Sequence, residues 1–585
     1  MIYLQLSIRW RDTTNQNSLS THQQTFIPPQ VYNPAPGVYV AVGYDIGNSI
    51  LVVNNNQAVL IDTVGTLATG NLVKAAFEEA LGTPIPPIVA VVYTHSHPDH
   101  FGGTLAFTIP TGTPIISAAT FLLGIQKTVA TQAAIISRSA KQFGYFLGAP
   151  DVDGFLGCGL GNQLFYDSTP KLLPPIVNPN AISPLAPTTR TLAGLEFKFL
   201  FTPGETDDTI TVYIPSLKVV MVGDNVYSCF PNLYATRGTP PRDVKAWYLS
   251  VDAVRNIQPG PAEVLIGSHS PPIVGAAYIA STLTTYRDGI QYVHDQTVAL
   301  INKGLFPDDI ANAIVLPPAL ADAPFLQEYY GFIPWCVKSI FTFYLGWFSG
   351  NIAELDLPST SVQANRFVDL AGGPLIAIVK AVDSLNDGTI DGAQWALQIS
   401  DAVLKSAPAD ASYISYAQDI YIQAAQIIGL NQKSSNGRNY YLSVVEELVA
   451  QANPATAAFL DQLKEYHTTQ EHMGAIPAHF METVLPIRVN PSKTAEIVLP
   501  VKVLLKDIDL EYSVVVRRGI AEVFEASSPI ASSYDFAFEV TFATVHSFKS
   551  VILGLTTVEG EIINQNIISS NASIEEMSFF FDLFQ

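Results

Sequence analysis

Three histidines and an aspartate fall within six consecutive residues, directly after an apolar run. The run, residues 88–93, is rich in β-branched side chains and is typical of a buried strand. The residues that follow carry imidazoles at His95, His97 and His100, a carboxylate at Asp99, and then two glycines. A loop at the end of a strand directs such side chains into a common space. Four potential ligands at this spacing favour a metal site over a metal-free, histidine-rich surface loop.

The composition indicates a globular protein of several domains. A chain of 585 residues is too long to fold around a single hydrophobic core, so three or four domains are expected. Hydrophobic residues make up 48% and charged residues 14%, as in packed rather than disordered chains. The net charge of −21 argues against nucleic acid as a partner, and an anionic substrate would need local cations. Three scattered cysteines, Cys158, Cys229 and Cys336, are expected to be buried thiols.

No targeting or membrane segment is predicted. The first residues contain no basic region followed by an apolar one, so no signal peptide is expected. The cytoplasm is the expected location, with the periplasm and secretion left open. The aromatic segment 329–350 is interrupted by Pro334 and Lys338, which favours a buried or substrate-facing helix over a transmembrane span.

The histidine segment is preceded by a strand-rich region. Residues 1–35 are polar and are interpreted as an N-terminal extension. Strand-like runs with a hairpin turn at 54–57 follow, and helical spacing over 71–81 leads into the histidine strand. Asp62 ends one of these strands and either orients a histidine or caps a turn. This alternation of strand, helix and strand predicts a layered α/β domain.

Three later apolar runs each lead into a further potential ligand. The pairs of run and ligand are 197–201 with Glu205, 218–222 with Asp224, and 263–266 with His269. Asp207 and Asp208 are alternatives to Glu205. Strand ends that repeatedly carry ligands predict that all of them meet at one edge of the domain.

The ordered His-x-His-x-Asp-His pattern resembles the signature of the metallo-β-lactamase superfamily, whose fold is an αββα sandwich. Most members use a histidine where this chain has Glu205. A carboxylate there, with the intervals to Asp224 and His269, resembles the alkyl sulfatase branch, although one residue is missing before Glu205. The resemblance implies two Zn²⁺ ions per chain, with Asp224 bridging them. The implied ligands are His95, His97, Asp99, His100, Glu205, Asp224 and His269.

Residues 230–238 resemble the sulfate-binding segment of the same branch. The resemblance implies that Asn232 and Arg237 bind the sulfate group, since the planar guanidinium matches two sulfate oxygens. A surface salt bridge is the alternative for Arg237. Arg242 is a weaker substrate-binding candidate, and Tyr145 is a candidate substrate-facing tyrosine. The residues expected to take part in catalysis are Asp99, Asp224 and Arg237.

Three further features of the sequence have a structural and a functional interpretation. The glycine-rich segment 156–161 resembles a family loop near the site, where it either packs as a tight turn or contacts substrate. His294 is interpreted as a core histidine rather than a residue near the metals. Trp335 occupies a place where some family members have a histidine, so a proton-donor role is not assigned to it.

The rest of the chain resembles the other domains of alkyl sulfatases. Residues 307–474 are mostly helical and resemble the dimerisation domain, with one tetratricopeptide-like hairpin formed by 393–405 and 412–428. A homodimer is therefore implied. Residues 475–585 show strand patterns at 497–504, 512–516 and 536–542 and helical spacing over 544–555 and 573–584, and they resemble a sterol-carrier-type domain. Its apolar face either guides an alkyl tail or packs as an ordinary core. The expected domains are 1–35, 36–306, 307–474 and 475–585.

The resemblance implies a zinc-dependent hydrolase of organic, mainly alkyl, sulfate monoesters. Such an enzyme releases an alcohol and inorganic sulfate by attack of a metal-bound hydroxide on sulfur or on carbon. The expected substrate is a small sulfate ester with an apolar chain. One alternative is a hydrolase of the same fold for β-lactams, lactones or phosphoesters. The other is a non-catalytic, lipid-binding dimer.

Overall fold

The chain divides into two compact units in the computed structural model. The first comprises Met1–Phe121, Ser137–Tyr166 and Val177–Leu460, and the second Leu122–Ile136, Asp167–Ile176 and Asp461–Gln585. The structure describes residues 13–145, 147–148, 154–162, 182–183, 185–406, 411–451 and 476–585, with Asp461 and Thr469. The extreme N-terminus, the connection at 407–410 and the expected boundary at 474–475 lie outside the described residues.

Two six-stranded sheets form the core of the first unit. The first sheet has its strands in chain order, namely β1 (Gln30–Ala35), β2 (Val38–Val42), β3 (Ser49–Asn54), β4 (Gln57–Thr63), β5 (Ile88–Val92) and β6 (Ile115–Ile116). The second has the order β12-β11-β10-β9-β8-β7, with β7 (Thr188–Leu192), β8 (Leu195–Phe201), β9 (Ile210–Ile214), β10 (Val219–Met221), β11 (Val264–Ile266) and β12 (Ile273–Val274). Buried aliphatic and aromatic side chains of both sheets form one shared core.

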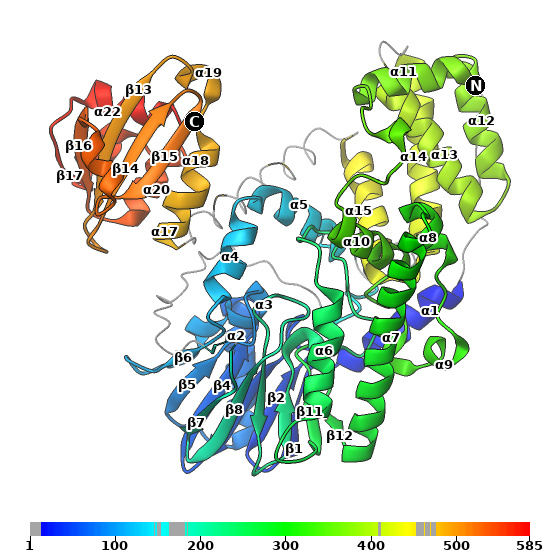
Figure 1. The fold of residues 1–585 in the computed structure, drawn as a ribbon, viewed down its shortest axis with the longest axis horizontal. Helices are drawn as coiled ribbons and strands as arrows, with labels where there is room; N and C mark the ends of the chain where they lie inside the picture. The colour runs from blue at the N-terminus through cyan, green and yellow to red at the C-terminus, as the bar shows by residue number, and fades with distance from the viewer. Residues whose placement is uncertain are drawn as a thin grey trace. The chain divides into compact units, whose positions relative to one another are not determined.

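Helices cover the outer faces of these sheets. On the first sheet, α2 (Leu67–Leu81) contacts β1 and β2, and Thr66 and Thr69 form a capping box at its start. On the second lie α6 (Val244–Arg255) and α7 (Ala276–Asn302) (Figure 1). These two helices pack through a core that includes Trp247 and Tyr286. Helix, sheet, sheet and helix therefore stack in layers, which confirms the expected αββα sandwich.

Part of the expected N-terminal extension belongs to the sandwich. β1 pairs antiparallel with β2, so the first sheet begins inside the range 1–35. α1 (Thr13–Gln23) precedes it, and Asn15 and Gln16 donate hydrogen bonds to the carbonyl oxygens of Asn431 and Leu430. The low apolar content of this segment concealed the strand because β1 is an edge strand with mostly exposed or half-buried side chains.

A helical region follows α7. Its main helices are α8 (Pro307–Ala313), α9 (Pro318–Ala321), α10 (Ile333–Leu345), α11 (Thr360–Ala371), α12 (Pro374–Asn386), α13 (Ile390–Lys405), α14 (Ala411–Leu430) and α15 (Ser435–Gln451). α13 and α14 pack along each other, which confirms the expected hairpin. Among the described helices, none has the length and apolar character that crossing a bilayer requires.

A five-stranded sheet with order β15-β14-β13-β16-β17 dominates the described part of the second unit. Its strands are β13 (Val498–Leu505), β14 (Leu510–Arg517), β15 (Ile520–Glu525), β16 (Phe538–Phe542) and β17 (Ile567–Ser570), and its larger helices are α20 (Val545–Ile552), α21 (Val558–Ile563) and α22 (Ile574–Asp582). The sequence pattern predicted β13, β14, β16 and both longer helices but not β15 or β17. The two missed strands lie at the sheet edges and bury few side chains, so their alternation is weak.

Candidate metal centre

The histidine segment is a tight turn after β5 that carries His95 and His97, followed by a one-turn helix, α3 (Pro98–Phe101), that carries Asp99 and His100. Two glycines after α3 let this turn lie directly against the end of β4. A Cβ atom at Gly102 would overlap the carbonyl oxygen of Gly65, and one at Gly103 would overlap that of Thr63. The close approach requires glycine at both positions.

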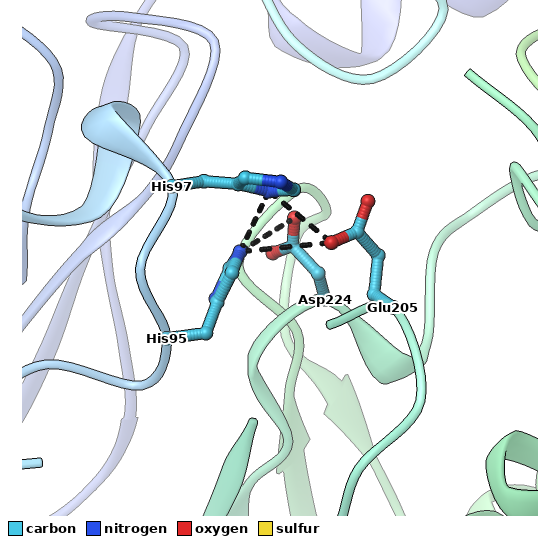
Figure 2. Close-up of side chains that lie close together, drawn as sticks. All are labelled: His95, His97, Glu205 and Asp224. Atoms are coloured by element: carbon cyan, nitrogen blue, oxygen red, sulfur yellow. Dashed lines mark hydrogen bonds and ion pairs between the residues drawn. The ribbon is translucent and has the colours of Figure 1, made fainter. Parts of the chain in front are cut away.

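Four side chains from three loops converge to form the first half of the site (Figure 2). His95 Nε2 lies 3.0 Å from His97 Nδ1, 3.6 Å from Asp224 Oδ2 and 3.8 Å from Glu205 Oε2. His97 Nδ1 lies 3.1 Å from Glu205 Oε2. The loops after β5, β8 and β10 supply these groups, as the sequence predicted.

The second half consists of Asp99, His100 and His269, and it adjoins Asp224. Asp99 Oδ2 lies 3.3 Å from His100 Nε2 and 3.5 Å from His269 Nε2. The two oxygens of Asp224 are divided between these histidines, with Oδ2 2.9 Å from His269 Nε2 and Oδ1 3.5 Å from His100 Nε2. Asp224 therefore faces both halves, which is the position of a bridging carboxylate.

The donor set fits divalent metal ions. Ligand atoms about 2.0–2.1 Å from one ion at tetrahedral angles lie about 3.3 Å apart, and the spacings in both halves scatter around this value. Three buried atoms of the cluster, His100 Nε2, Glu205 Oε2 and Asp224 Oδ1, have no hydrogen-bond partner. Buried polar atoms without partners are costly, so their convergence indicates a cation between them.

Hydrogen bonds fix the orientation of the histidines. Asp62 accepts from His100 Nδ1 at 2.9 Å, from the Thr94 amide at 2.8 Å and from the Thr94 hydroxyl at 2.7 Å. His269 Nδ1 donates to the Ile46 carbonyl at 2.8 Å. In both rings Nε2 is left with its lone pair toward the cluster. The prediction that Asp62 orients a histidine is confirmed.

Burial has the largest effect on the pKa of His95 and His97. It lowers the pKa of His95 to about 3, with a smaller contribution from His100, and with Arg237 it holds the pKa of His97 well below its usual value. Both rings are therefore neutral near pH 7, the form that binds metal ions.

At His100 and His269, neighbouring carboxylates outweigh burial and raise the pKa. Burial alone would lower the pKa of His100, but Asp99 and Asp224 raise it well above its usual value. At His269 the lowering of the pKa by burial is likewise outweighed, mainly by Asp224. A divalent cation among these carboxylates competes with the same protons, so binding at this half releases them.

Arg242 pairs with a carboxylate of the cluster, and its role in substrate binding stays a prediction. Its guanidinium is buried and forms an ion pair with Glu205 Oε1, and it also donates to the Asn232 carbonyl. Because Arg242 pairs with Oε1, only Oε2 of Glu205 faces His95 and His97. Burial raises the pKa of Glu205 to about 7 despite the opposing effect of Arg242. The alternative ligand Asp208 instead accepts from the Ser96 hydroxyl at 3.1 Å.

Arg237 lies at the mouth of the first half. Its Nη2 is 3.0 Å from His97 Nε2, the ring nitrogen that faces away from the cluster. The Asn232 side chain is buried, and its Nδ2 has no hydrogen-bond partner. Both are thus available as donors to an anion next to the cluster. Tyr145 is half-buried after α5 (Gln132–Gln142), and its substrate role stays a prediction.

Other predicted features supply no side chain to the two groups of potential ligands. His294 hydrogen-bonds Asp295 and the Tyr344 hydroxyl, as expected of a core histidine. In the glycine-rich segment, Gly161 packs against the backbone of Ile46, which supports the tight-turn interpretation. All three cysteines are buried, as predicted.

Sequence reasoning missed two buried residues beside the site. Asp45 accepts from the amides of Ile46 and Gly65, and Gln142 accepts from the amide of Arg237. Burial raises the pKa of Asp45 to about 6. The polar, glycine-flanked loop that contains Asp45 was a usable signal, but nothing in the local sequence distinguishes Gln142 from a surface residue of an amphipathic helix.

Comparison with known protein families gives two matches. Residues 42–269 match the metallo-beta-lactamase superfamily, and residues 306–451 match the family described as alkyl sulfatase dimerisation. The first match contains every residue of the cluster, and the second covers most of the helical region.

Similar proteins of known activity span most of the chain. A linear primary-alkylsulfatase of Pseudomonas sp. is 29% identical over 530 residues, which cover 86% of this chain and 95% of the relative. An alkyl/aryl-sulfatase of Saccharomyces cerevisiae is 29% identical over 70% of this chain and 62% of its own length. The structure of the stereoselective inverting sec-alkylsulfatase Pisa1 from Pseudomonas sp. superposes with a TM-score of 0.83 at 22% identity, covering 97% of this chain and 86% of the other. That structural likeness shows the shared fold.

Proposed function

This chain combines a metallo-beta-lactamase superfamily domain with an alkyl sulfatase dimerisation domain, and we propose that it hydrolyses alkyl sulfate monoesters to an alcohol and inorganic sulfate. The observation that carries the proposal is the position of Arg237, which presents a guanidinium 3.0 Å from His97 at the edge of a cluster that fits two metal ions. A cation at this place compensates the charge of a sulfate group that the acidic chain would otherwise repel.

The chain uses a divalent metal, and we propose two Zn²⁺ ions. His95, His97, Glu205 and Asp224 would hold one of them, and Asp99, His100 and His269, together with Asp224, would hold the other. Imidazole and carboxylate donors at tetrahedral spacing suit zinc. When bound, such ions act as Lewis acids and lower the pKa of a water from about 15.7 to roughly 7.

The protein's own groups bind and orient the ester. Arg237 donates two parallel hydrogen bonds to sulfate oxygens, and Asn232 Nδ2 donates a third. This arrangement directs the alcohol part of the ester away from the guanidinium. Asp99 and Asp224, which face the second half, accept hydrogen bonds and so hold the attacking water in line. Because sulfate is a good leaving group, attack on carbon needs little help from a general acid.

A substrate panel tests the reaction class. The purified protein is assayed with dodecyl sulfate, an aryl sulfate and nitrocefin, with and without a chelator. We expect chelator-sensitive turnover of dodecyl sulfate and none of nitrocefin. The reverse preference would favour another hydrolase of the same fold. Fewer than about one tightly held metal ion per chain, without turnover, would favour a non-catalytic lipid-binding dimer.

Isotope labelling identifies the bond that is cleaved. Hydrolysis in ¹⁸O-labelled water places the label in the alcohol if carbon is attacked and in sulfate if sulfur is attacked. Label found only in sulfate would rule out attack on carbon.

We further propose a homodimer formed through the helical region. Trp347 and Ile352, which follow α10, are 74% and 83% exposed, and Leu357 nearby is also exposed. Apolar side chains gathered in this way within a dimerisation domain are suited to a second copy of the chain. Replacing Trp347 and Ile352 together by Ser should give a monomer in light scattering. Ile563→Ser, at an equally exposed position of the second unit, should stay dimeric.

Three expectations from the sequence remain proposals. The domain boundaries at 306–307 and 474–475 can be tested by limited proteolysis. A role of the last domain in guiding alkyl tails predicts that its removal raises the KM for long-chain esters more than for short ones. Cell fractionation tests the expected cytoplasmic location.

A further inference from the structure

Gln142, the last residue of α5, is fully buried and contacts three separate segments of the first unit. Its Oε1 accepts a hydrogen bond from the Arg237 amide at 2.8 Å and another from the Thr236 hydroxyl at 2.9 Å. Its Nε2 donates to the Tyr330 hydroxyl at 3.3 Å. One amide side chain therefore meets the segment that carries the arginine next to the metal cluster.

The orientation of this amide follows from its partners. A backbone N–H only donates, so the Gln142 atom that faces the Arg237 amide must be the oxygen. The nitrogen then has to face Tyr330, whose hydroxyl accepts. The hydroxyls of Thr236 and Tyr330 can donate or accept, so both are compatible with the orientation that the Arg237 amide sets.

A second residue of α5 holds the same segment. Arg138 Nε donates to the Thr236 carbonyl at 3.0 Å. Thr236 is therefore held at its carbonyl by Arg138 and at its hydroxyl by Gln142, and the adjacent Arg237 is held at its amide. With its backbone fixed at these points, Arg237 directs Nη2 to within 3.0 Å of His97.

Gln142 also connects this segment to the helical region. Tyr330 precedes α10, and Asn439 in α15 donates through Nδ2 to the Gln142 carbonyl at 3.4 Å. Both partners fall within the part of the chain that matches the dimerisation family. Asn439 additionally donates to the Gly157 carbonyl at 3.0 Å, in the glycine-rich segment.

We propose that Gln142 is a positioning residue that fixes Arg237 for recognition of the sulfate group and ties that recognition to the helical region. The inference rests on the proposed function, because it assumes that Arg237 binds the anion. Gln142 itself touches neither the cluster nor the substrate. Its effect should therefore appear in anion binding and leave the chemical step and the metal content intact.

The test compares Gln142→Met with Arg237→Ala in the full-length protein. Methionine fills similar space but accepts no hydrogen bond from Arg237 or Thr236. We expect Gln142→Met to raise both the KM for dodecyl sulfate and the inhibition constant of inorganic sulfate about three- to tenfold, the effect of losing one or two hydrogen bonds. Arg237→Ala should raise them by roughly 10- to 100-fold, since a charged donor is lost. The kcat and bound metal of Gln142→Met should stay near the parent values.

Two further variants serve as controls for the effect of Gln142→Met on folding and on packing. Tyr330→Phe removes only the hydroxyl that orients the amide, so we expect a rise of about twofold in the same constants even if Gln142→Met folds poorly. Gln23→Met makes the same replacement at another buried glutamine of the first unit and should leave both constants unchanged.

The outcomes separate the inference from the function on which it rests. Unchanged constants in Gln142→Met and Tyr330→Phe, with a clear rise in Arg237→Ala, would overturn the role of Gln142 alone. Equal losses of kcat and metal in Gln142→Met would show general damage to the site and would also overturn it. Unchanged constants in Arg237→Ala would instead contradict anion binding by Arg237.

Discussion

The two halves of the metal cluster are balanced electrostatically by different partners. In the first half, Glu205 takes a place where a histidine is more common, and the buried guanidinium of Arg242 pairs with one of its oxygens. In the second half, the buried carboxylate of Asp62 accepts from His100. In the first half a guanidinium thus pairs with a ligand carboxylate, and in the second half a carboxylate accepts a hydrogen bond from a ligand imidazole.

This difference explains how the cluster accommodates an additional carboxylate. A glutamate in place of a histidine adds one negative charge, and in a buried site that charge is costly unless it is paired. Arg242 supplies the compensating charge and is also bonded to the Asn232 carbonyl, so the segment that contains Asn232 and the metal site are held by the same arginine. Specificity for an anion can then depend on Arg237, which is left at the open edge.

The largest effect should come from the one residue that belongs to both halves. Asp224→Ala removes a ligand from each, so we expect bound metal to fall below one ion per chain. Activity should fall by more than about 10³-fold, beyond the loss of a single electrostatic stabiliser. Metal analysis of the purified variant and its rate on dodecyl sulfate check this. Retention of two ions would show that Asp224 does not bridge.

Removing the ion pair between Glu205 and Arg242 in the first half should mainly lower the stability of the first unit. Glu205→Gln leaves Arg242 buried without a carboxylate, and we expect the free energy of unfolding of the first unit to fall by about 3–5 kcal/mol. Urea denaturation in the presence of chelator measures it without the contribution of metal. The double variant Glu205→Gln with Arg242→Met should recover part of the loss. An equal loss in the single and double variants would contradict the pairing.

Weakening the hydrogen bond from His100 to Asp62 in the second half should mainly lower the affinity for metal. Asp62→Asn cannot accept from all of its donors, so His100 loses its fixed orientation. We expect the affinity for one of the two ions to fall about 10- to 100-fold. Competition with a chromophoric chelator measures this. Asp208→Asn, at an equally buried carboxylate outside the cluster, is the matched control and should keep both affinities.

The smallest effect should come from the longest of the hydrogen bonds that Asp62 accepts. Ser268 Oγ donates to Asp62 Oδ2 at 3.3 Å, beside three shorter bonds to the same carboxylate. Ser268→Ala should change metal affinity and activity less than about threefold. A change as large as that of Asp62→Asn would show that the serine has a separate role in the site.

Much of the site was predictable because its ligands follow strand ends. The histidine motif and the later residues Glu205, Asp224 and His269 each come directly after a buried apolar run, and the structure brings all of them together. Asp62 was predictable for the same reason. The ion pair of Arg242 with Glu205 was not predicted, because the position of an arginine in the sequence does not reveal its buried partner.

The sequence by itself indicated a layered α/β domain with potential metal ligands after its strands, because strand periodicity and ligand spacing are local properties of the chain, and the resemblance to a known family supplied the finer assignment. Only the tertiary structure decided which groups support the ligands. Arg242 meets Glu205, and Gln142 meets Arg237 from 95 residues away, through packing between loops and helices that no local pattern encodes. The physical reason is that burial and pairing of polar groups depend on which surfaces come together, and that is settled when the whole unit packs.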